Sequence, residues 1–244
     1  MKNMVPARLR FFDRFMNWQG ARVLDLGCAG GFMAESLALR GALVAGIDPA
    51  ADAIAAAVAH AESTGLTITF DVGSGEALPY SEVTFDAVVC VDVLEHVADL
   101  QRVLAEVSRV LRPGGIFLFD TINCNLLARF VTITLGETLL RLLPGGTHDP
   151  AMFITPRELR AGLSGAGLVA ITFTGLGPRG LDRRGDLTFG HWPGTTVIYM
   201  GTARRSAADP HLRGVAEIRF GDNLKHCSVI KMVSMISWQT GLDY

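Results

Sequence analysis

The stretch LDLGCAGGF, residues 24–32, joins the end of a short β-type run to the start of a helical pattern. In open α/β sheets, ligands bind where the carboxyl ends of the strands meet the loops that follow. Glycine and other small residues at such a turn let the backbone approach a ligand closely. The stretch therefore predicts a nucleotide-type cofactor site, although the turn alone does not select one class of cofactor.

The rest of the chain repeats the same strand-then-helix order. Short runs of β-forming residues alternate with helical patterns, which is typical of parallel βαβ units. We predict an α/β, Rossmann-like fold with a seven-stranded, mostly parallel sheet, helices on both faces and a helical insertion after strand five. The expected strands are 22–27, 42–48, 67–73, 85–92, 116–122, 169–176 and 195–203, and the expected helices are 31–40, 50–64, 99–111 and 155–168. Residues 1–205 would form one domain, with the insertion at about 124–150, and residues 206–244 a C-terminal extension of unknown role.

Composition excludes several classes of protein. The formal net charge of -2 and the lack of a Lys/Arg block argue against a nucleic-acid partner. The four cysteines form no CxxC pair, so no zinc site is indicated. No run of about 18 apolar residues occurs, so we expect no membrane span. A cytoplasmic protein is the expectation, with the inner face of the membrane as the place where it would act.

Two carboxylates flank the predicted cofactor site. Asp25 lies near the end of the first strand, at the edge where such sheets bind their ligands. Asp48 ends the second strand, where a carboxylate can accept hydrogen bonds from a ribose 2′,3′-diol. An NAD enzyme would use Asp48 in the same way, but the third glycine of its GxGxxG motif would fall at Phe32. An NAD-dependent reductase is therefore the last-ranked alternative.

A third segment, GSGEALPYSEVTFDAVVCVDVLEHV at residues 73–97, resembles the class I methyltransferases that use S-adenosyl-L-methionine. The resemblance implies that the turn at Ser74, Gly75 and Glu76 reaches the adenine, although Ser74 stands where the family often has aspartate. The cofactor-binding residues that it implies are Asp25, Gly27, Cys28, Gly30, Asp48, Ser74, Gly75 and Val91. Each glycine by itself indicates no more than a tight turn. The prediction of a methyltransferase therefore depends on the three motifs occurring in this order along the chain.

The later motifs PGGTHD (144–149) and F-x-x-P-x-E-L (153–159) are similar to those of the ubiquinone-pathway O-methyltransferases. The similarity covers roughly residues 5–205 and implies O-methylation of a lipid-linked phenol, a polyprenyl catechol. That family usually has a further N-terminal helical segment that closes over the cofactor, whereas the given sequence begins almost at the first predicted strand, which leaves the presence of such a segment open. The alternatives are an O-methyltransferase for another phenolic metabolite and an inactive cofactor-binding module.

O-methylation of a phenol requires that the hydroxyl proton be removed, because the phenolate is the nucleophile. A phenol with a pKa near 10 lies about 4 kcal/mol from its phenolate at pH 7. If a helix follows the fourth strand, Asp92, Glu95 and His96 share one face and could bind Mg²⁺, or His96 could act as the base. The catalytic candidates are His96, Glu95 and His148. The alternative is that Glu95 and His96 only cap a helix or pack beneath the cofactor, and that His148 and Asp149 only clamp a loop.

The apolar insertion carries a narrow polar stripe. Asn125, Arg129, Glu137 and Arg141 recur at multiples of four residues, which leaves a wide apolar face. We predict either packing against protein or peripheral membrane contact through residues about 125–143, near a bilayer that holds the lipid-linked substrate.

Overall fold

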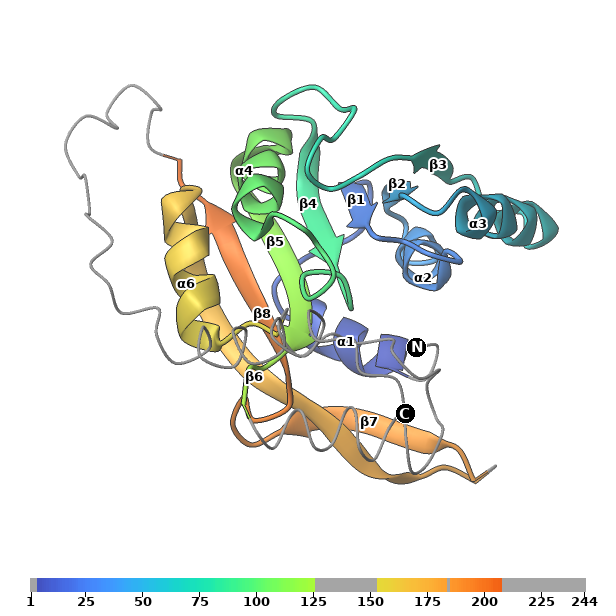
Figure 1. Ribbon diagram of the computed structural model, residues 1–244. Coiled ribbons are helices and arrows are strands. Elements are labelled where there is room, and N and C mark those ends of the chain that lie inside the picture. The colour runs from blue at the N-terminus through green and yellow to red at the C-terminus, as the bar shows by residue number, and fades with distance from the viewer. Residues whose placement is uncertain (1–3, 126–152, 184, 208–244) are drawn as a thin grey trace, which may run out of the picture.

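The computed structural model describes residues 4–125, 153–183 and 185–207. Helices and strands alternate through the first half of the chain, as the sequence predicts (Figure 1). The elements are α1 (Val5–Phe12), β1 (Arg22–Leu26), α2 (Phe32–Ala38), β2 (Leu43–Asp48), α3 (Ala51–Ser63), β3 (Thr69–Val72), β4 (Phe85–Cys90), α4 (Leu100–Val110), β5 (Leu111–Ile122), α6 (Pro156–Gly165), β6 (Leu168–Leu181), β7 (Leu187–Trp192) and β8 (Ile198–Arg205). The expected insertion falls almost wholly at residues 126–152 and the extension at 208–244, outside the described residues.

One sheet of eight strands, in the order β3-β2-β1-β4-β5-β8-β6-β7, organises the domain. Strands β1 to β5 pair in parallel, so their carboxyl ends share one edge. Strand β8 runs antiparallel between β5 and β6, and β7 pairs antiparallel with β6. The order reverses between β1 and β4, and this topological switch point is where such sheets bind ligands.

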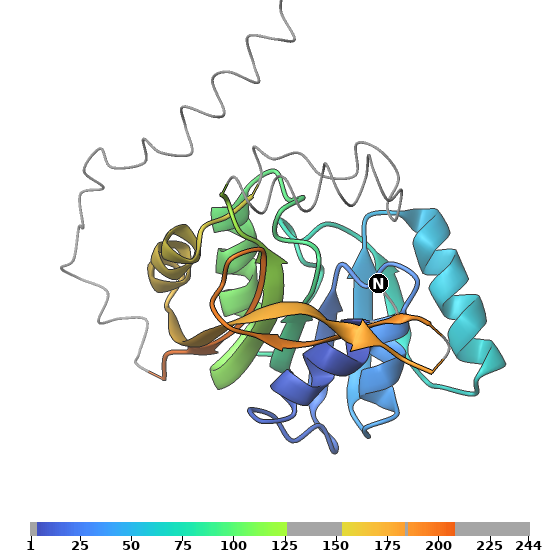
Figure 2. The ribbon, with the colours of Figure 1, turned by 90° about the horizontal axis from the view of Figure 1, so that it is seen from below.

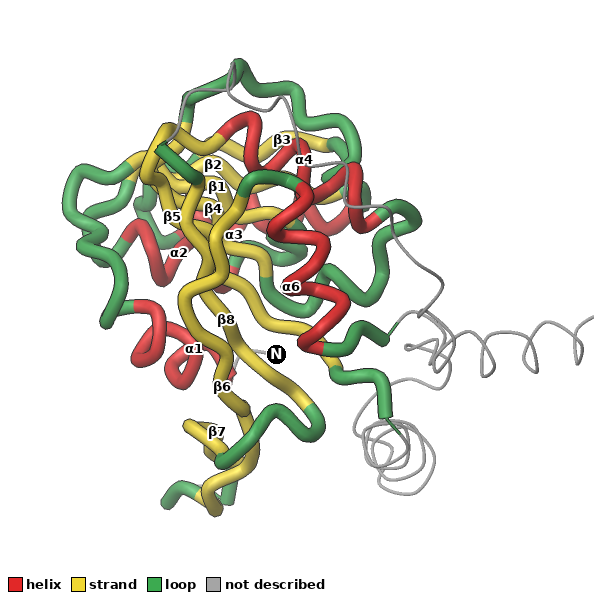
Figure 3. Tube along the Cα trace, turned by 90° about the vertical axis from the view of Figure 1, so that its left-hand side faces the viewer, coloured by secondary structure: helices red, strands yellow, loops and turns green. Residues whose placement is uncertain are grey.

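The predicted count of seven strands is wrong by one. Residues 187–192, expected to be loop, form β7 and extend β6 into a hairpin, which projects from the rest of the sheet in Figure 3. Asp182 closes the hairpin turn, because its carboxylate accepts a hydrogen bond from the backbone N–H of Asp186. Glycines at 175 and 177 leave room for Trp192, whose backbone and ring a Cβ there would meet within 3 Å. Gly175 and Gly177 are therefore positions of close contact between two strands of the sheet.

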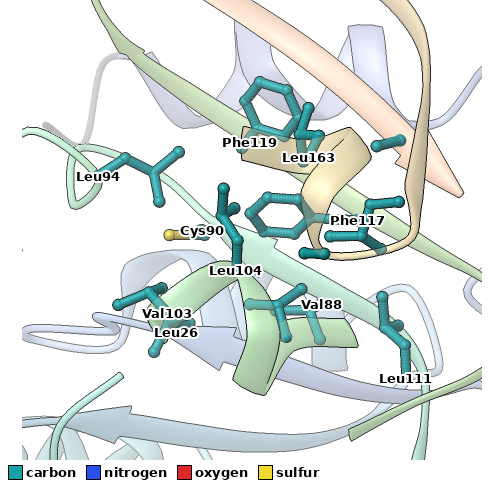
Figure 4. Packing of buried hydrophobic residues seen from close by; sticks show 14 of the residues in the cluster. Leu26, Val88, Cys90, Leu94, Val103, Leu104, Leu111, Phe117, Phe119 and Leu163 are labelled. Atoms are coloured by element: carbon teal, nitrogen blue, oxygen red, sulfur yellow. The ribbon is translucent and has the colours of Figure 1, made fainter. Parts of the chain in front are cut away.

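Both faces of the sheet are covered by helices, as Figures 1 and 2 show. Helices α4 and α6 pack on one face around Phe117 and Phe119 of β5, which Figure 4 shows at close range. Helices α1 and α2 pack on the opposite face, on Val23, Val89 and Leu118. Helix α6 begins with a capping box in which Thr155 and Glu158 satisfy each other's backbone N–H groups.

Helix α1 was not expected from the sequence. Pro6 suits the first turn of a helix because its missing N–H has no partner to lose there. The helix buries Leu9, Phe11 and Phe12 against the sheet, and Arg10 donates a hydrogen bond to the carbonyl of Phe189 on β7. Residues 5–12 therefore form a helix that packs on the domain, whereas the sequence analysis predicts no helix or strand before residue 22.

No described helix is long and apolar enough to cross a membrane.

Candidate functional site

The glycine-rich turn lies at the carboxyl end of β1, where the sequence predicts it. The backbone N–H groups of Gly27 and Cys28 both donate to the carbonyl of Ile47, which fixes the turn to the end of β2. Gly27 has φ 74°, and a Cβ at this position would lie 2.2 Å from a methyl carbon of Val93. A Cβ at Gly30 would meet only the Phe32 ring, at 3.8 Å, so the backbone there is approachable. Glycine is thus required at 27 for packing, and Gly30 is open to a ligand.

Asp25 is a buried charge beside this turn. Its side chain is fully buried, and among the described residues neither carboxylate oxygen has a hydrogen-bond partner. Burial raises the pKa of Asp25 to about 7, although the nearby N–H of Ala34 lowers it. Burying a carboxylate without a hydrogen-bond partner lowers the stability of the fold by about 1–3 kcal/mol or more. The group suits a cationic or hydrogen-bond-donating ligand.

Asp48 stands at the end of β2, one strand away from Asp25. Its two carboxylate oxygens accept hydrogen bonds of 2.9 Å from the backbone N–H groups of Ala29 and Ala50. Since each carboxylate oxygen can accept more than one hydrogen bond, the group can still bind a diol. Asp48 therefore holds the glycine-rich turn to the start of α3 and keeps acceptor capacity at the ribose position.

The turn after β3 completes this edge. The N–H of Gly73 donates to the carbonyl of Asp48, so Ser74 and Gly75 follow directly beside the second carboxylate. A Cβ at Gly75 would lie 3.3 Å from Leu26 at the end of β1, which shows how closely the turn approaches that strand. The structure thus brings the turns after β1, β2 and β3 to one edge.

Asp92, Glu95 and His96, which the sequence analysis predicts as metal ligands, do not come together in the structure. Residues 92–97 form turns, and the helix expected there begins only at Leu100. The Asp92 carboxylate is bound by Arg8, Glu95 is buried at 1% exposure, and His96 lies exposed at the surface. Within residues 4–125, 153–183 and 185–207, no three His, Cys, Asp or Glu side chains are grouped to hold a metal ion. The shared helical face that would have joined these three residues is absent because the segment turns.

Glu95 occupies a strongly buried position. One carboxylate oxygen accepts a hydrogen bond of 2.7 Å from the hydroxyl of Thr121 on β5, and the other has no partner among the described residues. Burial, and then the charges of Asp92 and Asp120, raise the pKa of Glu95 to about 8. Glu95 is therefore mostly protonated at neutral pH and can donate a hydrogen bond.

Arg8 is a site residue that the sequence did not reveal. Its guanidinium is 1% exposed and donates to Asp120 on β5 and to Asp92 after β4, both at 2.5 Å. Burial alone would lower the pKa of Arg8, but the charges of Asp120 and Asp92 raise it above its ordinary value. Asp120 also accepts a hydrogen bond from the backbone N–H of Asp92. No local sequence signal marks this residue, because its partners lie 84 and 112 positions away.

Comparison with known proteins identifies the family. Residues 24–119 match a model described as a methyltransferase domain. The chain is 38% identical over 183 residues to a ubiquinone biosynthesis O-methyltransferase of Coxiella burnetii, covering 75% of this chain and 78% of the relative. It is 39% identical over 202 residues to a protein of the same name from Chromobacterium violaceum, covering 82% and 85%. The chain belongs to the ubiquinone biosynthesis O-methyltransferase family.

A solved structure supports the fold assignment of this family member. The magnesium protoporphyrin IX methyltransferase of Synechocystis PCC 6803, solved with bound SAH, superposes with a TM-score of 0.61 at 20% identity, covering 84% of this chain and 83% of that one. The O-methyltransferase is thus an S-adenosyl-L-methionine-dependent enzyme with a Rossmann-like sheet. The predictions of family, fold class and enzyme class are confirmed.

The residues of the O-methyltransferase fit its cofactor. The unpartnered carboxylate of Asp25 is complementary to an ammonium group, and the open backbone at Gly30 admits close approach. Cys28 is 6% exposed within the turn, and Val91 is half-buried at the end of β4. His148 lies outside the described residues, so its catalytic role stays a prediction.

A separate open depression of about 250 Å³ lies at the opposite edge of the sheet. It is lined by Arg160, Ser164, Gly167, Leu168, Val169, Ala170 and Ser206. Val169 pairs with Arg204, which in turn pairs with Ile116 near the amino end of β5. The depression therefore lies away from the carboxyl edge and does not belong to the site.

Proposed function

We propose that this O-methyltransferase transfers the methyl group of S-adenosyl-L-methionine to a catechol-type hydroxyl of a polyprenylated ubiquinone precursor. The observation that carries the proposal is the 38% identity over 183 residues to a relative named for ubiquinone biosynthesis, of which the chain covers 78%. When bound, the cofactor supplies an electrophilic methyl group on a positively charged sulfur. The roles of the protein's own residues follow from their positions.

We propose that the carboxyl edge of β1 to β4 holds the cofactor. Asp25 would bind the ammonium group, Asp48 the ribose diol, and the turn at Ser74 and Gly75 the base. The main chain of Gly27, Cys28 and Gly30 would line the cofactor, with Val91 beside it. The proposal is supported by the meeting of these turns at the switch point of the sheet.

For the phenol proton, we propose that His96 acts as the base, with His148 as the alternative. An imidazole is the side chain most often used as a general base near pH 7, and a positioned base contributes about 10²–10⁴ in rate. Glu95 would act through its hydrogen bond to Thr121, which fixes the loop before His96. A base is proposed in place of Mg²⁺ because Arg8 already binds the Asp92 carboxylate.

The two ends of the insertion lie at this edge of the sheet. Asn125 donates a hydrogen bond of 2.6 Å to the carbonyl of Thr196, and the N–H of Ile154 donates to the carbonyl of Ile122. The chain therefore leaves and rejoins the sheet at the carboxyl end of β5. Peripheral membrane contact through residues about 125–143 stays a prediction, since nearly all of that range lies outside the described residues.

Radiolabelled methyl transfer to a short-chain demethylubiquinol tests the proposal, with a soluble catechol assayed beside it, each with and without EDTA. We expect product from demethylubiquinol, a lower rate with the soluble catechol, and no effect of EDTA. A preference for the soluble catechol would indicate another phenolic metabolite as substrate. Binding of S-adenosylhomocysteine without any product would indicate an inactive cofactor-binding module.

A further inference from the structure

The first half of strand β6 forms an open edge of the sheet. Residues Leu168 to Leu176 pair with β8 on one side, whereas β7 pairs only with Gly175 and the residues after it. On the side away from β8, no strand among the described residues pairs with residues 168–174 (Figure 3). The backbone N–H and C=O groups on that side are therefore available to a further strand.

This edge is also apolar. Val169 and Ile171 are 62% and 45% exposed. No charged residue occurs between Leu168 and Pro178, although charged side chains are a usual protection of a strand edge. The open depression of about 250 Å³ lies against the start of the same edge, since Leu168 and Val169 line it. An unprotected apolar edge of this kind readily binds a further strand through its main chain.

The C-terminal segment, residues 208–244, follows the described structure at the start of this edge. Strand β8 runs antiparallel to β6, and its last residue, Arg205, pairs with Leu168. The N–H of Ser206 then donates a hydrogen bond of 3.1 Å to the carbonyl of Gly167, and Ser206 lines the depression. The C-terminal segment therefore starts beside the open edge.

A disulfide supplies a second anchor for the segment. Cys124 is disulfide-bonded, whereas Cys28 and Cys90 are buried free cysteines. The chain has four cysteines, so Cys227 is the partner that remains for Cys124 within the chain. The C-terminal segment is therefore tied at its start to β6 and further along to the residue that follows β5.

Cys124 lies beyond the opposite end of the open edge. It follows β5, whose last residue, Ile122, pairs with Ile198 of β8. Ile198 pairs in turn with Leu176 of β6, whereas the first anchor lies beside Leu168. The two anchors thus stand at opposite ends of the stretch of β6 that β7 leaves largely uncovered.

The chain between these two anchors has the length and the pattern of a covering strand. Fully extended, it could reach about 60 Å, whereas the uncovered stretch of β6 is about 26 Å long. Within it, residues 215–220 read VAEIRF, so that Ile218 and Phe220 fall on one face of an extended chain and Glu217 and Arg219 on the other. Such an alternation is typical of a strand with one buried face.

We propose that residues 215–220 form a further strand on the open edge of β6 and cover Val169 and Ile171. The strand runs from the start of β6 toward Cys124, in the same direction as β6. A second copy of the chain is the competing occupant of this edge. The C-terminal segment is favoured because it starts beside the edge, at an effective concentration that a separate molecule does not reach.

Hydrogen exchange without reductant, on the full chain and on a chain that ends at Ala207, tests the proposal. The N–H groups of residues 168–174 that point away from β8 should exchange at least about tenfold faster in the shortened chain, because they lose their partners. The amides of β4, residues 85–90, should exchange equally slowly in both proteins, which shows that the fold is retained. Equal exchange of residues 168–174 in the two proteins would overturn the proposal.

Ile218→Asp provides a second test at full chain length. It should raise the exchange of residues 168–174 toward that of the shortened chain, because it places a charge against the exposed valine and isoleucine of the edge. Arg219→Asp, on the other face of the proposed strand, is the matched control and should exchange like the wild type. Wild-type exchange in Ile218→Asp would rule out residues 215–220 as the covering strand.

Peptide mapping without reductant and light scattering distinguish the C-terminal segment from a second copy. We expect Cys124 to be joined to Cys227 in a protein of monomer mass, with exchange of residues 168–174 that does not depend on protein concentration. Protection that grows with concentration together with a dimer mass would identify a second copy and overturn the proposal. Recovery of Cys124 as a free thiol would remove the second anchor and count against the route.

Discussion

Left-handed backbone conformations outside glycine occur at Ala29, Val83 and Asp92 in the described part of the chain. Ala29 gains a hydrogen bond from its N–H to Asp48, and Asp92 gains one from its N–H to Asp120. Both compensated residues lie at the site, where such strain commonly serves positioning. Val83 is different, because it is β-branched, 48% exposed and remote from the site.

A substitution at Val83 should relieve the strain of its left-handed backbone conformation. Its φ of 57° costs a β-branched residue about 1–2 kcal/mol, whereas asparagine adopts this region more readily. Val83→Asn should raise the free energy of unfolding by about 1 kcal/mol without changing methyl transfer. Urea denaturation provides the measurement, with Val169→Asn as control because Val169 is also exposed but lies within strand β6. An equal change in both variants would show that the left-handed conformation is not the cause.

At the scale of the elements, helix α1 carries a buried arginine that pairs with carboxylates on the sheet. Arg8 reaches from this helix to two carboxylates that end or follow β4 and β5, so α1 is joined to the carboxyl edge of the sheet. Asp120 is fully buried and would be left without its cation if Arg8 were removed. Removing one partner of a buried ion pair costs about 3–5 kcal/mol because the other charge stays desolvated.

Arg8→Ala should therefore lower the free energy of unfolding by about 3 kcal/mol or more. Arg10→Ala is the control on the same helix, since Arg10 is exposed and makes one hydrogen bond to the carbonyl of Phe189, worth about 1 kcal/mol. Adding Asp120→Asn to Arg8→Ala should recover part of the loss. Chemical denaturation gives the free energy of unfolding of each variant. A similar decrease in Arg8→Ala and Arg10→Ala would contradict the role of the buried Arg8 ion pairs in stability.

For the whole molecule, the concentration of buried acids at one edge sets the pH dependence of stability. Burial raises the pKa of Asp25 to about 7 and that of Glu95 to about 8. Between the unfolded values near 4 and these folded values, the folded chain holds more protons than the unfolded chain. Stability from these groups is therefore full below about pH 4 and is lost as the pH rises through 7 to 8.

The free energy of unfolding should accordingly fall between about pH 5.5 and about pH 7.5, by up to about 1.4 kcal/mol per pH unit for each group that titrates. Asp25→Asn should flatten this slope and raise stability near pH 7.5, while weakening S-adenosylhomocysteine binding by about tenfold or more. Denaturation at the two pH values and calorimetry give the measurements. The outcome against the prediction is a stability in the wild type that stays level or rises over this range.

The sequence alone predicts the first five strands and their order along the chain, because the apolar runs and turn residues that specify them are local. For the same reason it places Asp25, Gly27 and Asp48 at one edge, since a parallel sheet brings the carboxyl ends of its strands together. The capping box of α6 is equally local, within the four residues Thr155 to Glu158. The family motifs add the cofactor and the reaction.

Only the tertiary structure decides the rest, because the interactions concerned join distant parts of the chain. Strand β7 forms where its residues find β6 as a partner, against the local preference of a glycine-rich stretch. Asp92, Glu95 and His96 separate because Arg8, which is distant in sequence, binds the first and the sheet buries the second. Desolvation and long-range ion pairing depend on which groups the fold encloses together, and no spacing along the sequence records them.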